Sequence, residues 1–209
     1  MNILKTISLL VLMLMLSYSS LVVAYDPMNS VVGFNEQGSA VVLHKNNQHI
    51  IVLTNFHIIR KGLTPRIKII HRELVTEATV TILKLDINND LALLSLQLDK
   101  ELPLEITSLC VDNPKVYDEV IAIGAGLGYS PFPTKGMVSI PEMEPPNIVI
   151  LHSAPITFGN SGGGLFKKEY DNYCLIGINS KMSGVKNFPI SHMAIAVHLK
   201  IIKEFYEAR

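Results

Sequence analysis

Short runs rich in Val, Ile and Leu, separated by turn residues, recur along the chain after residue 30. Among them are "HIIVLTNF", "LALLSLQL", "NIVILH" and "CLIGINS", and between the runs lie "KNNQ", "DNP" and "PFPTKG". Runs of this length bounded by Asn, Asp, Pro and Gly are typical of short strands. No alternation of strand and helix patterns is visible, which argues against a doubly wound α/β fold. The pattern therefore predicts an all-β barrel or sandwich.

The final segment, "VHLKIIKEFYEAR", is the one part of the chain with a helical pattern. Its apolar positions 197, 199, 201, 202 and 205 fall roughly on one face of a helix. Near "CVDNPKVYDE", residues 110–119, the apolar runs pause and divide the chain into halves of similar size. We expect two packed domains, residues 25–112 and 113–209.

The first 24 residues differ from the rest of the chain. Lys5 precedes the apolar run "ISLLVLMLML", and Val22 and Ala24 stand where a signal peptidase requires small residues. This arrangement predicts a signal peptide, residues 1–24, cleaved before Tyr25. The alternative is an uncleaved membrane anchor, since residues 7–24 nearly suffice to span a bilayer, although serines interrupt the run. Both interpretations place the rest of the chain outside the cytoplasm, in the periplasm or the medium, and only the second ties it to a membrane.

The charge and the cysteine content narrow the classes of partner and ligand. The chain has 18 basic and 18 acidic residues, so nothing indicates nucleic acid or acidic lipid as a partner. Cys110 and Cys174 are compatible with a disulfide in an exported protein or with two buried thiols, and the sequence leaves both possibilities open. Two distant cysteines are not a zinc pattern, and we expect neither a metal nor a cofactor.

The stretch "GNSGGG", residues 159–164, surrounds Ser161 with four glycines, which indicates an unusual backbone path. A serine hydroxyl becomes a nucleophile only when a base takes its proton, and the base works best beside a carboxylate. His57 ends a strongly apolar run and is the best candidate base. Asp90 directly precedes an apolar run and is favoured as the acid over Asp86, which we interpret as a turn residue.

Four stretches, "GSAVVL" (38–43), "LTNFHII" (53–59), "NDLALLSL" (89–96) and "GNSGGGLF" (159–166), resemble the trypsin/chymotrypsin-like serine peptidases. The HtrA-type branch is the most similar, since Thr-Asn-x-His, Asp-Leu-Ala and Gly-Asn-Ser-Gly-Gly are typical of it. "GMVSI" and "MAIAVHLKIIKEF" also resemble segments of that branch. The resemblance runs from about residue 30 to the end of the chain.

The resemblance implies two packed six-stranded antiparallel β-barrels with a C-terminal helix, and a catalytic site between the barrels. It implies that Ser161 attacks the scissile carbonyl, His57 transfers the proton and Asp90 orients His57. The backbone N–H groups of Gly159 and Ser161 would form the oxyanion hole. The expected reaction is hydrolysis of peptide bonds in proteins or peptides through a covalent acyl-enzyme.

The resemblance also suggests which residues line the specificity pocket: Ile156, Thr157, Asn179, Ser180 and Lys181, with Pro155 just before them. No Asp or Glu occurs between residues 150 and 160, so an anion that would select Arg or Lys is missing. We therefore expect a preference for small or medium apolar side chains, although Lys181 departs from the usual pattern.

The chain departs from the family pattern in two further ways, and the sequence also leaves alternative functions open. Gly164 stands where the family usually has proline, and the sequence given ends at Arg209 without the PDZ domain that HtrA-type enzymes usually carry. Ser161 also fits the nucleophile elbow of α/β-hydrolases, but that fold needs an acid and a histidine after the serine, and only 48 residues follow it. The remaining alternatives are a non-catalytic binding protein on the same fold and a latent enzyme that needs a partner. The oligomeric state is not indicated.

Overall fold

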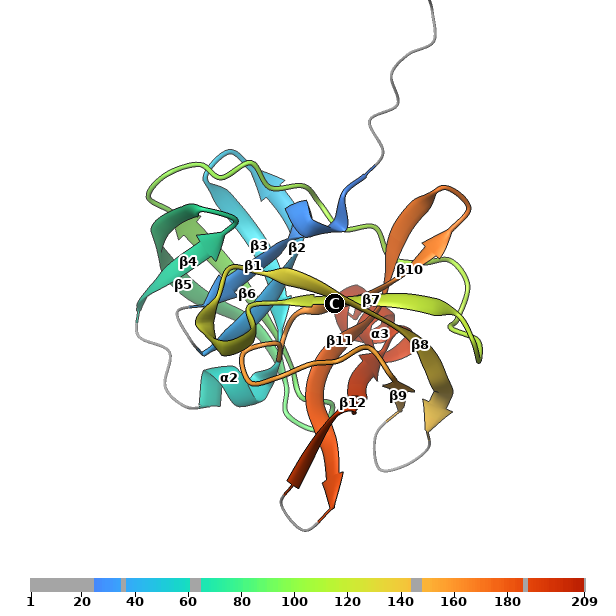
Figure 1. Cartoon of the computed structure of the whole chain (residues 1–209). Helices are drawn as coiled ribbons and strands as arrows, with labels where there is room; N and C mark the ends of the chain where they lie inside the picture. Colours follow the sequence, from blue (N-terminus) through green and yellow to red (C-terminus); the bar gives the residue numbers. More distant parts are fainter. Residues whose placement is uncertain (1–24, 35–36, 61–64, 144–147, 186–187, 209) are drawn as a thin grey trace, which may run out of the picture.

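The computed structural model describes residues 25–34, 37–60, 65–143, 148–185 and 188–208. The strands form two closed antiparallel barrels that lie side by side, the first blue to green and the second yellow-green to red (Figure 1). The first barrel has the order β1-β2-β3-β6-β5-β4 and the second the order β10-β11-β12-β9-β8-β7. The predicted all-β architecture of two six-stranded barrels with a C-terminal helix is confirmed.

The strands of the first barrel are β1 (Val31–Phe34), β2 (Gly38–Asn46), β3 (His49–Thr54), β4 (Arg66–His71), β5 (Leu74–Asp86) and β6 (Leu91–Leu98). Those of the second barrel are β7 (Glu119–Gly124), β8 (Phe132–Met143), β9 (Val149–His152), β10 (Gly164–Glu169), β11 (Asn172–Val185) and β12 (Phe188–His198). Each barrel is closed by pairing of the first and last strands in its spatial order, β1 with β4 and β10 with β7.

The helical segments of the described chain are short. They are the 3-10 turns η1 (Pro27–Ser30) and η2 (Gly126–Gly128) and the helices α2 (Phe56–Arg60) and α3 (Leu199–Glu207). The sequence pattern suggested a helix from Val197, but β12 continues to His198, whose Nδ1 accepts a hydrogen bond from the Lys200 N–H and caps α3. The helix begins only there because Val197 pairs with Ile178 in the β11–β12 ladder.

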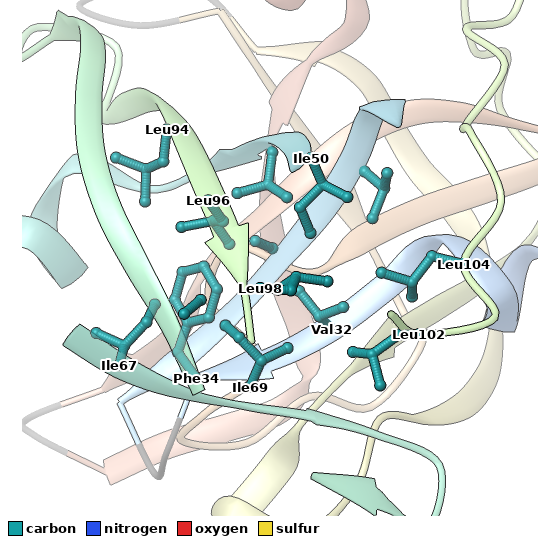
Figure 2. Packing of buried hydrophobic residues seen from close by; sticks show 14 of the residues in the cluster. Val32, Phe34, Ile50, Ile67, Ile69, Leu94, Leu96, Leu98, Leu102 and Leu104 are labelled. Carbon is teal, nitrogen blue, oxygen red and sulfur yellow. The ribbon is translucent and has the colours of Figure 1, made fainter. Parts of the chain in front are cut away.

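Alternate residues of the first barrel fill its interior (Figure 2). Successive side chains of a strand point to opposite faces, so one set of residues from each strand meets inside a closed barrel. The set is almost entirely aliphatic, and it includes two residues of the segment after β6: Val32, Phe34, Ile50, Ile69, Leu94, Leu96, Leu98, Leu102 and Leu104.

The outward set of the same strands is also apolar where the first barrel meets the second. This inter-barrel cluster joins residues of β1, β2, β3 and β6 to residues of β7, β10, β11, β12 and α3: Val31, Val41, Leu43, Leu53, Leu91, Ile123, Phe166, Leu175, Ile178, Val197, Ile201, Ile202 and Phe205. Burial on both faces explains why the runs read as continuously apolar rather than alternating. The inter-barrel cluster also fixes the position of the two barrels relative to each other.

The segment between β6 and β7 crosses from one barrel to the other. Leu102 and Leu104 lie in the core of the first barrel, whereas Leu109 forms a bridge with Leu175 of β11 in the second. A disulfide joins Cys110, the residue after Leu109, to Cys174, the residue before Leu175. The crossing segment is therefore fastened to the second barrel by backbone hydrogen bonds and by a covalent link.

Candidate active site

His57 and Asp90 meet because β3 and β6 are neighbours in the first barrel. Thr54, the last residue of β3, pairs with Ala92, so the residues that follow β3 and precede β6 share one end of the sheet. The Nδ1 atom of His57 lies 2.8 Å from Oδ2 of Asp90, and the backbone N–H of His57 donates to Oδ1 at 2.9 Å. Both carboxylate oxygens of Asp90 therefore hold the same histidine.

Further contacts fix the backbone at Asp90. Its carbonyl oxygen accepts hydrogen bonds from the Nδ2 of Asn55, at 3.0 Å, and from the N–H of Phe56, at 3.2 Å. Asp90 has a φ of 58°, in the left-handed region that Asp and Asn tolerate better than most residues. Asp86, the alternative acid, instead accepts hydrogen bonds from the backbone and side chain of Asn89, and these bonds stabilise the turn between β5 and β6.

Ser161 lies on the loop between β9 and β10, and β11 holds this loop by backbone hydrogen bonds. The Gly162 N–H donates to the Asn179 carbonyl and the Asn179 N–H donates to the Gly163 carbonyl, both at 2.8 Å. Gly162 has a φ of 84°, and a Cβ on it would collide with the carbonyl oxygen of Ser39. Only glycine fits this position, which accounts for one of the glycines that follow the serine.

Ser39 of β2 connects the first barrel to the serine loop of the second. Its Oγ donates to the Gly159 carbonyl and accepts from the Ala125 N–H, each at 2.7 Å, and its own N–H donates to the Ser161 carbonyl at 2.7 Å. The Ser39 carbonyl in turn accepts from Oγ1 of Thr54. These bonds place the loop that carries Ser161 next to the strand end that carries His57.

Ser180 of β11 links the serine to the His57–Asp90 pair. The Ser161 hydroxyl donates to the Ser180 carbonyl oxygen at 2.8 Å, and the Ser180 hydroxyl donates to Oδ2 of Asp90 at 2.7 Å. Oδ2 thus accepts from both Ser180 and His57. Ser161, Ser180, Asp90 and His57 form one connected polar group contributed by both barrels.

The electrostatics of this group favour an ionised Asp90. Burial alone would raise the pKa of its carboxyl group, but hydrogen bonds from His57 and Ser180 outweigh burial and hold the pKa below the ordinary value. A charged Asp90 favours the tautomer of His57 that carries its proton on Nδ1. The Nε2 atom of that tautomer is then a proton acceptor.

The backbone before Ser161 orients two N–H groups. The Phe158 carbonyl accepts from the Leu127 N–H at 2.6 Å, and the Asn160 carbonyl accepts from the Gly163 N–H at 2.9 Å. In a trans peptide the N–H points opposite to the preceding C=O. The N–H groups of Gly159 and Ser161 therefore point away from these partners, and neither donates to any other residue that the structure describes.

A cleft of about 890 Å³ runs between the barrels past this group. Of the pocket residues suggested by the sequence, Ile156, Thr157, Ser180 and Lys181 line it. Asn179 does not, because its buried side chain donates to the Gly164 carbonyl beneath the serine loop. Lining residues that sequence reasoning missed include Arg60, Phe158, Met182, Ile195 and Val197.

His152 of β9 is fully buried and does not line the cleft. Burial lowers its pKa to about 4, and the nearby Asn179 side chain offsets this only in part. The two side chains lie close without a hydrogen bond of normal geometry, since both ring nitrogens of His152 and Oδ1 of Asn179 lack such a partner. His152 is therefore a neutral core residue under the serine loop.

Two observations concern metals and membranes. Within the described residues, the one group of three potential metal ligands is Cys110, Glu169 and Cys174, and the disulfide already occupies both sulfur atoms. No helix in the described ranges combines the length and the hydropathy needed to cross a bilayer. The segment 1–24, interpreted from sequence as a signal peptide or anchor, lies outside the described residues.

Comparison with known proteins agrees with this fold. The family model of the trypsin-like peptidase domain matches residues 38–178, and the chain belongs to this family. Its similarities lie on the HtrA-type branch. A probable periplasmic serine endoprotease, DegP-like, from Hahella chejuensis is 31% identical over 150 residues, which cover 69% of this chain and 29% of that protein.

Solved structures share this fold. The serine endoprotease from Yersinia pestis superposes with a TM-score of 0.67 at 22% identity, over 87% of this chain and 62% of that one. The HtrA-type protease AlgW with a tripeptide gives a TM-score of 0.67 at 25% identity, over 87% and 61%. The chain thus spans less than a third of its DegP-like relative and about three fifths of these two structures.

Proposed function

We propose that this protein is a serine endopeptidase in which Ser161 is the nucleophile, His57 the general base and Asp90 the residue that orients the base. The observation that carries the proposal is the pairing of His57 Nδ1 with Asp90 Oδ2 in the same cleft that Ser161 lines. Nucleophile and base come from different barrels, so the site requires the complete fold.

The reaction proceeds by acyl transfer. The Ser161 hydroxyl leaves the Ser180 carbonyl and turns toward Nε2 of His57, which takes its proton as Oγ bonds to the substrate carbonyl carbon. His57 then gives this proton to the departing amine as the C–N bond breaks. A water molecule next loses a proton to His57 and attacks the acyl ester. The bond from the acyl carbon to Oγ then breaks, and His57 returns the proton to Oγ, which releases the acid and restores the serine hydroxyl.

The N–H groups of Gly159 and Ser161 stabilise the oxyanion of each tetrahedral intermediate. Their orientation supports this role, because the carbonyls of the preceding peptides are engaged on the opposite side by Leu127 and Gly163. Such donors act on charge that develops only during the reaction, and one of them typically contributes ~10²–10³ in rate.

The substrate binds as an extended strand against β11. β10 pairs with β11 only as far as Ile178, whereas β12 pairs along the other edge of β11 beyond that point. The edge of β11 from Ser180 onward therefore faces the cleft without a strand partner in the described structure. Extended peptides commonly add to such an edge.

The side chain of the residue whose carbonyl is attacked enters an apolar-leaning pocket. Ile156, Ile195 and Val197 contribute to the cleft lining, and the described lining contains no carboxylate other than Asp90. This composition favours small or medium apolar side chains over Arg or Lys. The proposed substrates are proteins or peptides outside the cytoplasm, in keeping with a signal peptide or anchor at residues 1–24.

A fluorophosphonate probe tests the proposal directly. Purified residues 25–209 should be labelled, whereas Ser161→Ala and His57→Ala should not, and Ser183→Ala, a serine of β11 outside the cleft lining, should be labelled like the wild type. Absence of labelling in folded wild type would contradict the proposal and indicate a non-catalytic binding protein, or a latent enzyme if a partner restores labelling.

A further inference from the structure

The cleft carries more positive than negative charge near the reacting groups. Arg60 of α2 and Lys181 of β11 both line it and are both exposed. The one carboxylate among the described lining residues is Asp90, which already accepts hydrogen bonds from His57 and Ser180. An anionic group that enters the cleft therefore meets cations without a competing unpaired carboxylate.

Lys181 differs from several other lysines in having no ion pair within the described structure. Lys45, Lys135, Lys167 and Lys168 lie within 4.0 Å of carboxylate oxygens. In the β11–β12 ladder, Lys181 pairs with Ile195, an apolar residue. Its ammonium group is thus available to a ligand in the cleft.

The strand register fixes which substrate residue Lys181 would meet, if the substrate adds to β11 as proposed above. The N–H of the attacked residue replaces the Ser161 hydroxyl as donor to the Ser180 carbonyl. In an antiparallel ladder, this bond sets the register. The substrate residue immediately before the attacked one then lies directly opposite Lys181, in a non-hydrogen-bonded pair. The side chains of such a pair lie on one face, with Cβ atoms about 4.5–5.5 Å apart.

We propose that Lys181 is a specificity-determining residue that selects an acidic side chain at the substrate position immediately before the attacked residue. This inference rests on the proposed function and extends it from the apolar pocket to the neighbouring position. An opposed Glu or Asp pairs with the ammonium group, whereas an opposed Lys or Arg is repelled.

Internally quenched peptides that differ only in Glu, Gln or Lys at this position test the inference. We expect kcat/KM to favour Glu over Lys by about tenfold at low ionic strength, and the ratio to shrink toward unity in about 1 M salt, because exposed ion pairs are individually weak and screened. Lys181→Gln should reduce the ratio and Lys181→Glu should invert it. Lys168→Gln, which removes the same charge from a surface lysine of β10, should leave the ratio unchanged.

Binding to the Ser161→Ala variant separates this inference from the proposed chemistry. Fluorescence anisotropy with the same peptides should give tighter binding of the Glu peptide, and Lys181→Glu in that background should reverse the order. A Glu-to-Lys ratio near unity, or one that Lys181→Glu does not change, would overturn the inference even if every peptide is cleaved. A reversed binding order without any cleavage would support the inference while the endopeptidase proposal fails.

Discussion

The hydroxyl of Ser180 donates a 2.7 Å hydrogen bond to Oδ2 of Asp90, the oxygen that also faces Nδ1 of His57. The two residues lie 90 positions apart and belong to different barrels. Ser180 thereby ties the orientation of the proposed base to β11, the strand proposed to receive the substrate.

Replacement of Ser180 by Ala should lower kcat/KM by about tenfold or more, since a hydrogen bond to a charged group is worth about 1.5–3 kcal/mol. Loss of the donor should also raise the pKa of Asp90, because one of the hydrogen bonds that hold it low is removed. Steady-state kinetics measure the first effect, and NMR titration of the carboxyl group measures the second. The control is Ser183→Ala on the same strand, and wild-type values of kcat/KM and of the Asp90 pKa in Ser180→Ala would contradict the assigned role.

Replacement of Ser39 by Ala should impair both activity and stability. The change leaves the Gly159 carbonyl and the Ala125 N–H without the bonds that Ser39 supplies, which typically costs about 1–3 kcal/mol in free energy of unfolding. Because Gly159 belongs to the proposed oxyanion hole, kcat should fall as well.

Urea unfolding and kcat measurements on the same samples check this prediction. Ser30→Ala is the matched control, because Ser30 is equally buried and donates to the Pro27 carbonyl away from the cleft. It should lower the free energy of unfolding without lowering kcat. Equal effects of the two variants on kcat would mean that Ser39 acts through general stability alone.

Replacement of Gly159 by Ala should reduce the rate of fluorophosphonate labelling by about 100-fold, the typical effect of losing one oxyanion donor. Gly159 has a φ of 96°, and a Cβ on it would collide with the carbonyl oxygen of Ala125, so the peptide must reorient. Time-resolved labelling measures the rate, and far-UV circular dichroism verifies that the barrels remain folded. A folded variant that is labelled at the wild-type rate would exclude Gly159 from the oxyanion hole.

Stability should fall as the pH drops from about 6.5 to about 4, in part because of His152. Its pKa is about 4 in the folded protein and near 6.5 when exposed, so the unfolded chain binds the proton first. Stability is therefore complete above the unfolded pKa and declines below it, by about 2 kcal/mol between pH 7 and pH 5 for this residue. Burial lowers the pKa of His71 and of His198 as well, which adds to the same trend.

Urea unfolding at pH 7 and pH 5 isolates the contribution of His152. His152→Gln should lose less stability between these pH values than the wild type, whereas His192→Gln, which removes an exposed histidine, should behave as the wild type does. An unchanged pH dependence in His152→Gln would refute the prediction.

The bond between Cys110 and Cys174 should be present in the purified protein and should stabilise it. The bond closes a sequence separation of 64 residues, and removal of a native disulfide typically costs about 2–4 kcal/mol. Cys110→Ala/Cys174→Ala should therefore unfold at lower urea concentration than the wild type. Mass spectrometry after alkylation should find no modified cysteine without reductant, and two alkyl groups under that condition would contradict the bond.

Contacts of short sequence range were predictable, and contacts between strands were not. The positions of His57 and Asp90 at strand ends follow from local runs and turns, as does the glycine-rich loop around Ser161. The roles of Ser39 and Ser180 have no local signal, because the Ser39 hydroxyl bonds to residues 86 and 120 positions away and the Ser180 hydroxyl to one 90 positions away. Asn179 was misplaced for the same reason, since the bulge in β11 between Asn179 and Lys181 decides which side chains face the cleft.

The all-β class, the family resemblance and the three residues proposed to carry the chemistry could be predicted from the amino-acid sequence, because strand periodicity and turn chemistry are encoded within short windows. The folded structure was needed to show that Ser180 bonds to Asp90, that the Asn179 side chain bonds to the Gly164 carbonyl and that Lys181 lines the cleft without an ion pair in the described chain. These relationships depend on barrel closure and on the packing of two barrels, and both follow from strand pairings between residues that are distant in the chain.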